Sequence, residues 1–209
     1  MSYYYTDDEG KFLVKLARKT IETYLLEKKK IKPPEDTPEK LKQNSGVFVT
    51  INKLVGEKKK REHELRGCIG FPMPIKPLVE ATIDAAIEAA FHDPRFSPLD
   101  ADELDDIVVE VSILTPPKKL EVSDPREYPL KIKIGRDGLI IRYGFYSGLL
   151  LPQVPVEQGW DENLFLSYTC YKAGLPPDCW HNKNVEVYTF QAEIFEEIEP
   201  RGAIKRKEL

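Results

Sequence analysis

The chain has 209 residues, of which 41% are hydrophobic and 32% are charged, and its formal net charge is -4 at pH 7. This composition is typical of a globular protein and excludes a disordered chain. The acidic balance lacks the basic signature of a duplex DNA binder, so duplex DNA is not an expected partner, whereas an RNA partner stays open. The length predicts one large domain or a domain with two lobes.

The three cysteines are Cys68, Cys170 and Cys179. Their odd number and the lack of a CxxC pair predict no disulfide framework and favour a reducing, cytoplasmic compartment. The spacing of Cys170, Cys179 and His181 does not match a zinc site, so we expect no metal and no cofactor. The N-terminus does not resemble a signal peptide, and no apolar run reaches membrane-spanning length, so no membrane is expected. Abundant Lys and Glu indicate a heat-adapted source.

The first predicted element is a helix from about Asp7 to Lys28. Thr6 and Glu9 have the spacing of a capping box, in which each side chain bonds the other residue's backbone N–H. Apolar residues then recur at helical spacing. The Pro-rich, polar residues 31–45 predict a loop.

A hairpin follows, with strands predicted at Val47–Val55 and Leu65–Phe71. The charged connection between them contains His63 and is expected to lie in water. Helical spacing returns over Ile75–Phe91, and a turn forced by two prolines precedes a largely buried strand at Ile107–Leu114.

The pair Pro116-Pro117 predicts a lobe boundary near residue 118. The elements predicted beyond it are a hairpin, a third strand, a helix capped by Asp161, a long final strand and a charged, mobile tail. Their ranges are Leu130–Ile134 with Leu139–Tyr143, Leu149–Leu151, Glu162–Lys172, Val185–Ile198 and residues 201–209.

The stretch LRGCIG at residues 65–70 is the first candidate site, because it places a cation, a thiol and two glycines within six residues. Arg66 and Cys68 share a strand face, so Arg66 could lower the pKa of the Cys68 thiol and make it a nucleophile. The alternative is that Cys68 is a small buried side chain beside glycines such as Gly67. His92 is a candidate base for the thiol, with a surface or turn-bonding histidine as the alternative.

The stretch HDPRF contributes Asp93 and Arg95. The simplest interpretation is a turn in which Asp93 bonds backbone amides and Arg95 pairs with an acid. In the functional alternative, Arg95 faces the same cleft as Arg66, and the two arginines bind a carboxylate, a phosphate or a nucleotide. The sequence contains neither a GxGxxG motif nor a P-loop, so a standard nucleotide fold is not indicated.

A second unusual segment, YGFYSGLLLPQV at residues 143–154, contains aromatic residues, two glycines and a Gln after a proline. It could be a hairpin with its hydrophobic ends tucked in. It could also be a lip that closes over LRGCIG, with Ser147 and Gln153 supplying hydrogen bonds.

LRGCIG, DPRFSPL at 93–99, LLLPQV at 149–154 and the following Trp160-Asp161 together resemble the AMMECR family, named after a contiguous-gene deletion syndrome. The order and spacing match from the first helix to the last strand. The resemblance implies an α+β fold, in which a large subdomain holds both termini and a small one is inserted, each with a mainly antiparallel sheet and helices. It also implies that the hallmark motif lies in a cleft between them, with Arg66, Gly67 and Cys68 at the hallmark positions.

We therefore expect a large subdomain of residues 1–117 and 183–209 and a small subdomain of residues 118–182. The family it resembles has no established activity, so two hypotheses about function stand. One is an enzyme or small-anion binding protein with its site around Cys68. The other is an adaptor that binds a protein or RNA partner through the same cleft without chemistry.

Overall fold

The computed structural model describes residues 4–56 and 62–207 and contains two compact units. The first unit is the chain up to Leu114 together with the segment from Glu193 onward, and the second is Thr115–Ala192. The second unit is thus an insertion in the first. Helices and two antiparallel sheets are present, so the predicted α+β fold is confirmed.

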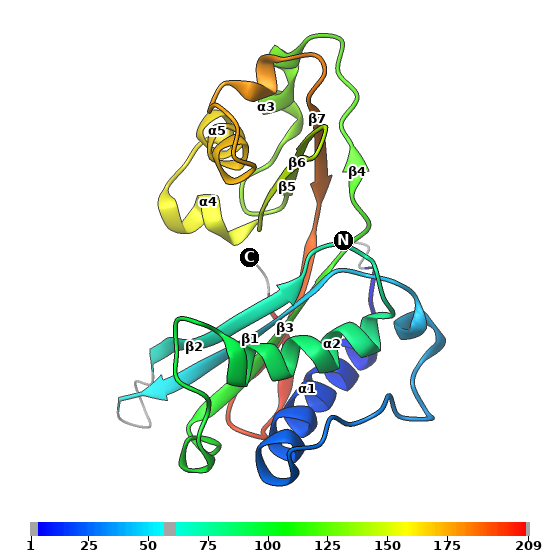
Figure 1. Cartoon of the computed structure of the whole chain (residues 1–209), viewed down its shortest axis with the longest axis vertical. Helices are drawn as coiled ribbons and strands as arrows, with labels where there is room; N and C mark the ends of the chain where they lie inside the picture. Colours follow the sequence, from blue (N-terminus) through cyan, green and yellow to red (C-terminus); the bar gives the residue numbers. More distant parts are fainter. Residues whose placement is uncertain (1–3, 57–61, 208–209) are drawn as a thin grey trace. The chain divides into compact units, whose positions relative to one another are not determined.

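The first unit has a five-stranded sheet, and Figure 1 shows helices α1 (Asp7–Glu27) and α2 (Leu78–Ile87) together on one side of it. A single apolar cluster lies between sheet and helices, with residues such as Leu13, Ile51 and Ile83 fully or almost fully buried. The strand order is β2-β1-β3-β8-β9, with β2 (Glu62–Phe71), β1 (Val47–Val55), β3 (Ile107–Leu114), β8 (Ala192–Glu197) and β9 (Ile204–Lys207).

Helix α1 begins as the sequence predicts, with the Thr6–Glu9 capping box formed in both directions. Halfway along it, Arg18 forms a buried ion pair with Glu197 of β8 and donates to the carbonyl of Ile107, 2.7 Å away. The Glu197 carboxylate also accepts the backbone N–H of Val109 at 3.0 Å. This pair therefore connects the helix to two neighbouring strands.

The segment around α2 differs slightly from the prediction. The helix begins at Leu78 rather than Ile75, because Pro77 is the N-cap with an extended backbone (ψ 136°) and disfavours a helical conformation at the residue before it. It continues as a π-helical turn, η2 (Glu88–His92), which carries the chain to Asp93.

The prediction of a mobile C-terminal tail is wrong for the described residues up to 207. Residues 204–207 form β9 along β8, and Arg206 makes ion pairs with Asp7 and Glu193. The tail is fixed because its cations face acids on both neighbouring elements. Residues 57–61 of the predicted charged connection after β1 lie outside the described residues. Strand β2 begins at Glu62, so His63 is on a strand rather than in the connection.

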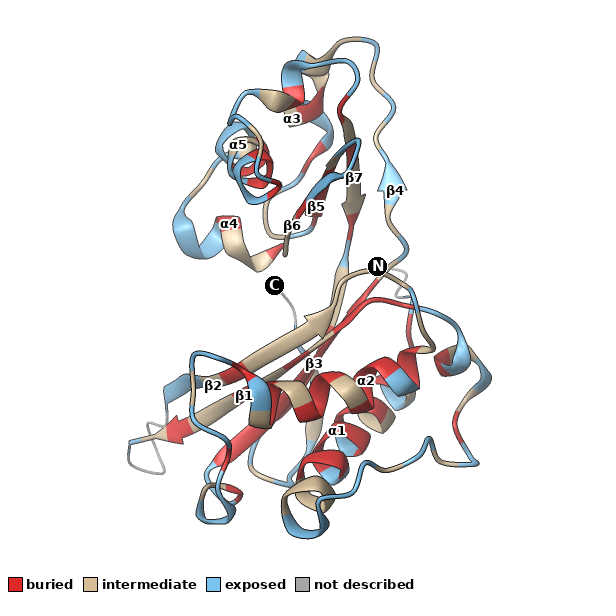
Figure 2. Cartoon of the chain, in the orientation of Figure 1, coloured by how far each residue is buried: buried red, intermediate tan, exposed pale blue. Residues whose placement is uncertain are grey.

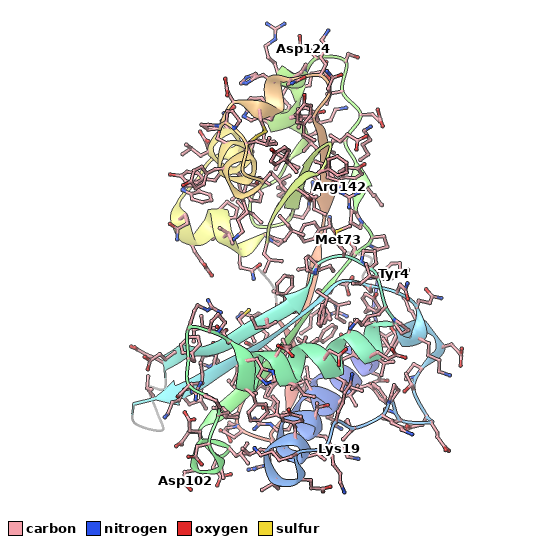
Figure 3. All side chains as sticks on the ribbon, in the orientation of Figure 1. Tyr4, Lys19, Met73, Asp102, Asp124 and Arg142 are labelled. Atoms are coloured by element: carbon pink, nitrogen blue, oxygen red, sulfur yellow. A yellow bond between two sulfur atoms is a disulfide. The ribbon has the colours of Figure 1, made fainter. Side chains whose placement is uncertain are left out.

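The second unit has a four-stranded sheet with the order β4-β7-β5-β6. Its own apolar cluster includes Phe165, Leu166 and Val187, and Arg142 of β5, labelled in Figure 3, lies over the ring of Tyr188. The strands are β4 (Lys118–Lys119), β7 (Glu186–Phe190), β5 (Gly138–Tyr143) and β6 (Tyr146–Leu150), and the helices are α3 (Tyr128–Lys131), α4 (Gln153–Gln158) and α5 (Glu162–Lys172).

Three predictions within this unit are corrected. No strand forms over Leu130–Ile134, because Pro129 near the start of α3 favours a helical turn there. The predicted third strand starts earlier, at Tyr146, and leaves a short turn at Gly144-Phe145. The predicted final strand Val185–Ile198 is divided at Gln191, since β7 pairs in the second unit's sheet and β8 in the first.

The prediction of no disulfide is also wrong, because Cys170 and Cys179 are bonded, with their Cα atoms 5.9 Å apart. The chain turns back after α5, where Gly174 has a positive φ of 76°. This turn brings the short η5 helix (Cys179–His181) against the end of α5. Sequence spacing could not reveal the pairing, since it depends on that reversal.

Candidate functional site

Cys68 lies on β2, which is an edge strand of the five-stranded sheet. In the pairing of β2 with β1, Cys68 is opposite Thr50. Its neighbour Gly67 faces the opposite side of the strand, where η2 passes very close. A Cβ atom at Gly67 would be 2.1 Å from the backbone oxygen of Ala89, which is too close for any side chain. The glycine of the motif therefore permits η2 to approach the sheet, while Cys68 points to the other face.

Asp93 and Arg95 hold the outer edge of β2 at Cys68. The backbone N–H of Cys68 donates to Asp93 Oδ2 at 2.9 Å, and its carbonyl accepts from Arg95 Nη2 at 3.1 Å. Arg95 also donates from Nε and Nη2 to the Asp93 carboxylate, at 3.0 and 2.7 Å. These two side chains take the place of a neighbouring strand, and we call Asp93 and Arg95 the edge clamp.

The edge clamp is asymmetric in its exposure. The Asp93 side chain is 1% exposed, whereas that of Arg95 is 53% exposed. Hydrogen bonds from the Arg95 guanidinium, aided by the Cys68 and Arg95 backbone N–H groups, hold the pKa of Asp93 well below its usual range. The carboxylate is therefore ionised at any physiological pH and fixes the guanidinium in one orientation.

The surroundings of Cys68 disfavour the thiolate form of its side chain. Burial raises its pKa, and neither the hydrogen bond with Thr50 Oγ1 at 3.2 Å nor the charge of Arg95 offsets that effect. The cation close enough to act on the thiol is thus Arg95, whereas Arg66 was expected. A thiol with a raised pKa stays protonated at neutral pH.

Arg66 points instead to Glu103, on the short η3 helix (Ala101–Glu103), which Asp102 marks in Figure 3. Its Nε and Nη2 donate to the two carboxylate oxygens, each at 2.9 Å. This pairing lowers the pKa of Glu103 to about 2. Both motif arginines are therefore paired with carboxylates, Arg66 on a buried side and Arg95 on a half-exposed one.

Two residues that the sequence did not single out lie beside Cys68. Thr50 is opposite Cys68, and Glu110 of β3 is opposite Thr50, so the three side chains follow one row across three strands. Glu110 is buried and accepts from Lys207 Nζ at 2.9 Å. Glu110 is the one carboxylate in a strand that the sequence predicts to be largely buried. Because carboxylates are rarely buried without a partner, this position could have been identified from the sequence.

The remaining predicted residues are placed elsewhere. His92 is half-exposed, with Nδ1 3.2 Å from Glu88, its partner one turn earlier. Ser147 is an exposed residue of β6, and Gln153 begins α4, both in the second unit. Within the described part of the chain, Gln153 Oε1 is buried without a hydrogen-bond partner. That Ser147 and Gln153 close over Cys68 stays a prediction.

The Asp-Pro-Arg sequence of the edge clamp occurs a second time, at Asp124-Pro125-Arg126. There too the aspartate accepts from the arginine backbone N–H, Nε and Nη2, at 2.9, 2.9 and 2.7 Å. The Arg126 side chain is 81% exposed. The ion pair is thus an intrinsic property of this turn, and contact with the Cys68 backbone distinguishes the first copy.

Other kinds of site are weakly supported. Among residues 4–56 and 62–207, no group of three or more His, Cys, Asp or Glu side chains could hold a metal ion. A pocket of about 410 Å³ in the second unit is lined by Tyr143, Asp178 and His181, among others, and by none of the predicted site residues. No helix in the described ranges is long and apolar enough to cross a membrane.

Comparisons with known proteins give one consistent result. The profile of the AMMECR1 family matches residues 14–195. A protein of Thermococcus gammatolerans is 60% identical over 99% of both chains, and protein PYRAB00100 of Pyrococcus abyssi is 59% identical over 97% of both. The crystal structure of the uncharacterized protein PH0010 from Pyrococcus horikoshii superposes with a TM-score of 0.87 and 59% identity, covering 99% of this chain and 100% of that one. These thermophilic sources fit the composition.

Proposed function

This chain belongs to the AMMECR1 family, and from that premise we propose that it is a cytoplasmic protein that binds a small anionic ligand beside Cys68. The observation that carries the proposal is the state of Arg95. Its Nε and Nη2 are held by Asp93 and the Cys68 carbonyl, while more than half of its side chain is exposed. A cation that is already oriented loses little conformational entropy when it binds a ligand.

The free edge of this guanidinium suits a carboxylate or phosphate. Nη1 takes part in none of the hydrogen bonds formed among the described residues, so it can donate to an anion without breaking the edge clamp. Arg66 contributes less than the sequence suggested, since Glu103 occupies the same two donors that a ligand would need. A ligand would therefore contact one arginine rather than two.

Cys68 then serves as a neutral hydrogen-bonding and packing group of the site. Its raised pKa disfavours the enzyme hypothesis in which it is a thiolate nucleophile at neutral pH. Glu110 is too well paired with Lys207 to serve readily as its base, and His92 is turned to Glu88. The adaptor hypothesis, with a protein or RNA partner, lacks a comparable supporting contact.

A cytoplasmic location is compatible with the Cys170–Cys179 disulfide. Cytosolic disulfides are rare in most organisms, but intracellular proteins of hyperthermophilic archaea are a known exception. The matched relatives are from such genera, including Pyrococcus and Thermococcus.

The proposal is tested by thermal stabilisation with inorganic phosphate and a panel of phosphorylated and carboxylated metabolites, because a ligand that binds the folded state raises its apparent stability. Arg95→Gln should abolish the shift in melting temperature given by any stabilising anion. Arg126→Gln removes the equivalent arginine of the second Asp-Pro-Arg turn and should leave the shift unchanged. Equal shifts in the wild type and Arg95→Gln would contradict the proposal.

A further inference from the structure

Helix α5 has an apolar side that faces solvent. Leu164, Tyr168 and Tyr171 recur at the i, i+4, i+7 spacing of one helix face, and they are 45, 44 and 73% exposed. Trp160, two residues before the helix, is partly buried against the core and extends this row by stacking on Tyr168, with ring centroids 4.0 Å apart and planes 2° from parallel. We call these four residues the α5 stripe.

Helix α5 cannot rotate to bury the α5 stripe, because its opposite face already packs in the core. Phe165, Leu166 and Cys170 lie on the opposite face and are fully buried in the second unit's core. Figure 2 shows this division of α5 into a buried and an exposed side. The Cys170–Cys179 disulfide further fixes the end of the helix. The stripe is thus a rigid surface.

We propose that the α5 stripe is a dimerisation surface, on which a second copy of this chain docks its own α5 in antiparallel orientation. Tyrosine and tryptophan are the residues most enriched at protein interfaces, and stacked rings lose little side-chain entropy on binding. A two-fold axis through the middle of α5 would pass between Leu164 and Tyr168. Each of these side chains would then pack against the same pair in the partner.

The charges at the two ends of α5 favour this occupant and this orientation. Asp161, the N-cap, and Lys172, the last residue, are eleven residues apart, about three helical turns, so they flank the stripe on the same side. In an antiparallel pair, the same flanks of the two helices meet, and each Asp161 would lie opposite the partner's Lys172. In a parallel pair opposite flanks meet, so Asp161 and Lys172 would not face their counterparts in the partner.

The size of the stripe sets the expected strength. The stripe offers three partly exposed side chains and one partly buried ring per copy, which is small for a specific interface, so we expect a weak dimer with a dissociation constant of about 10 to 100 µM. Such a dimer forms at the protein concentrations of sedimentation and light-scattering experiments.

Sedimentation velocity on the full chain, from about 1 to 200 µM, tests the proposal. The wild type should convert from monomer to dimer over this range, and Leu164→Glu/Tyr168→Glu should raise the dissociation constant at least about 100-fold. Leu130→Glu is the matched control: Leu130 is 85% exposed in the same unit but lies on α3, and this variant should dimerise like the wild type. A wild type that stays monomeric, or a dimer that survives the double substitution, overturns the proposal.

A charge reversal decides the matter if the double variant fails to fold. Lys172 is exposed, and Lys172→Glu leaves the packing of α5 intact while placing like charges at both ends of the antiparallel pair. It should weaken the dimer about tenfold, because two exposed ion pairs become repulsive. Adding Asp161→Asn, which keeps a good N-cap, should recover much of the loss. An unchanged dissociation constant in Lys172→Glu would exclude the antiparallel arrangement.

Discussion

The two Asp-Pro-Arg turns show how one short sequence serves two purposes. Both form the same internal ion pair, so the pairing needs nothing beyond the turn. At Asp93 and Arg95 the turn also bonds the backbone N–H and C=O of Cys68. The role of the motif therefore depends on what lies beside it, and the second turn is a built-in control.

Asp93→Asn should lower the free energy of unfolding by about 2 kcal/mol, since charge-assisted hydrogen bonds to a buried carboxylate are lost. Asp124→Asn removes the same bonds at a solvent-exposed turn and should have a much smaller effect. Chemical denaturation of the two variants beside the wild type measures the difference. Equal losses would mean that the contact with Cys68 adds no stability.

The Arg66–Glu103 pair predicts a specific acid sensitivity. The pKa of Glu103 is about 2 in the folded protein, below its ordinary value of 4.5. The pair therefore stabilises the fold fully above pH 4.5, and this stabilisation is lost as the pH falls from 4.5 toward 2. The difference in unfolding free energy between the wild type and Glu103→Gln should shrink over that interval. A difference that stays constant from pH 6 to pH 2.5 would contradict this assignment.

Cys68 should react slowly with iodoacetamide at neutral pH, because burial raises its pKa. The rate should keep rising above pH 9, whereas the same thiol in the denatured chain should react at an ordinary rate. Thr50→Val removes the hydrogen bond that favours the thiolate, so it should slow the reaction further. Alkylation of the native protein as fast as that of the denatured chain would exclude the buried, neutral thiol.

Sequence reasoning identified the residues of the site better than their partners. Cys68, Asp93 and Arg95 were singled out and do lie together, because chemically distinctive residues are visible in a sequence. Glu103 and Thr50 were missed, since their proximity depends on strand register and on the path of the chain after η2. The orientation of Arg66 was misjudged for the same reason.

At the scale of elements, the close approach of η2 to β2 is what positions the site. Gly67→Ala would place a Cβ atom against the Ala89 carbonyl, and backbone cannot move aside as a flexible side chain can. We expect a loss of about 2 to 3 kcal/mol in unfolding free energy, measured by denaturant titration. Cys68→Ala, on the opposite face of the same strand, should cost much less. A fully stable Gly67→Ala would show that η2 can be displaced.

The accuracy of the predicted elements follows the strength of their local signals. Helices α1 and α5 have side-chain caps, β3 is a largely apolar run, and the predicted bounds of all three agree with the structure to within one residue. The segment around Leu130 alternates like a strand, but Pro129 favours a helical turn at its start. Where β7 ends and β8 begins could not be foreseen, because an uninterrupted strand pattern does not reveal that two sheets share it.

At the scale of the whole molecule, two separate apolar cores predict two unfolding transitions. The disulfide closes a loop between residues nine apart within the second unit, which corresponds to about 3 kcal/mol of stabilisation in the chain-entropy description. Reduction should therefore lower the melting temperature of one calorimetric transition and leave the other in place. Cys179→Ser should lower the same transition and make it insensitive to reductant. Equal shifts of both transitions would show that the units unfold together.

The insertion of the second unit also sets an order of folding during synthesis. Ribosomes make β1, β2 and β3 first, and β8 and β9 only after the whole of Thr115–Ala192. Until then β3 lacks a neighbour on one side, and Arg18 has no Glu197 to neutralise it. The second unit has no such dependence, because its buried core residues all lie between Tyr128 and Val187. The second unit should therefore fold first, although it is made in the middle of the chain. The sheet of the first unit is completed only afterwards, when β8 and β9 have been made.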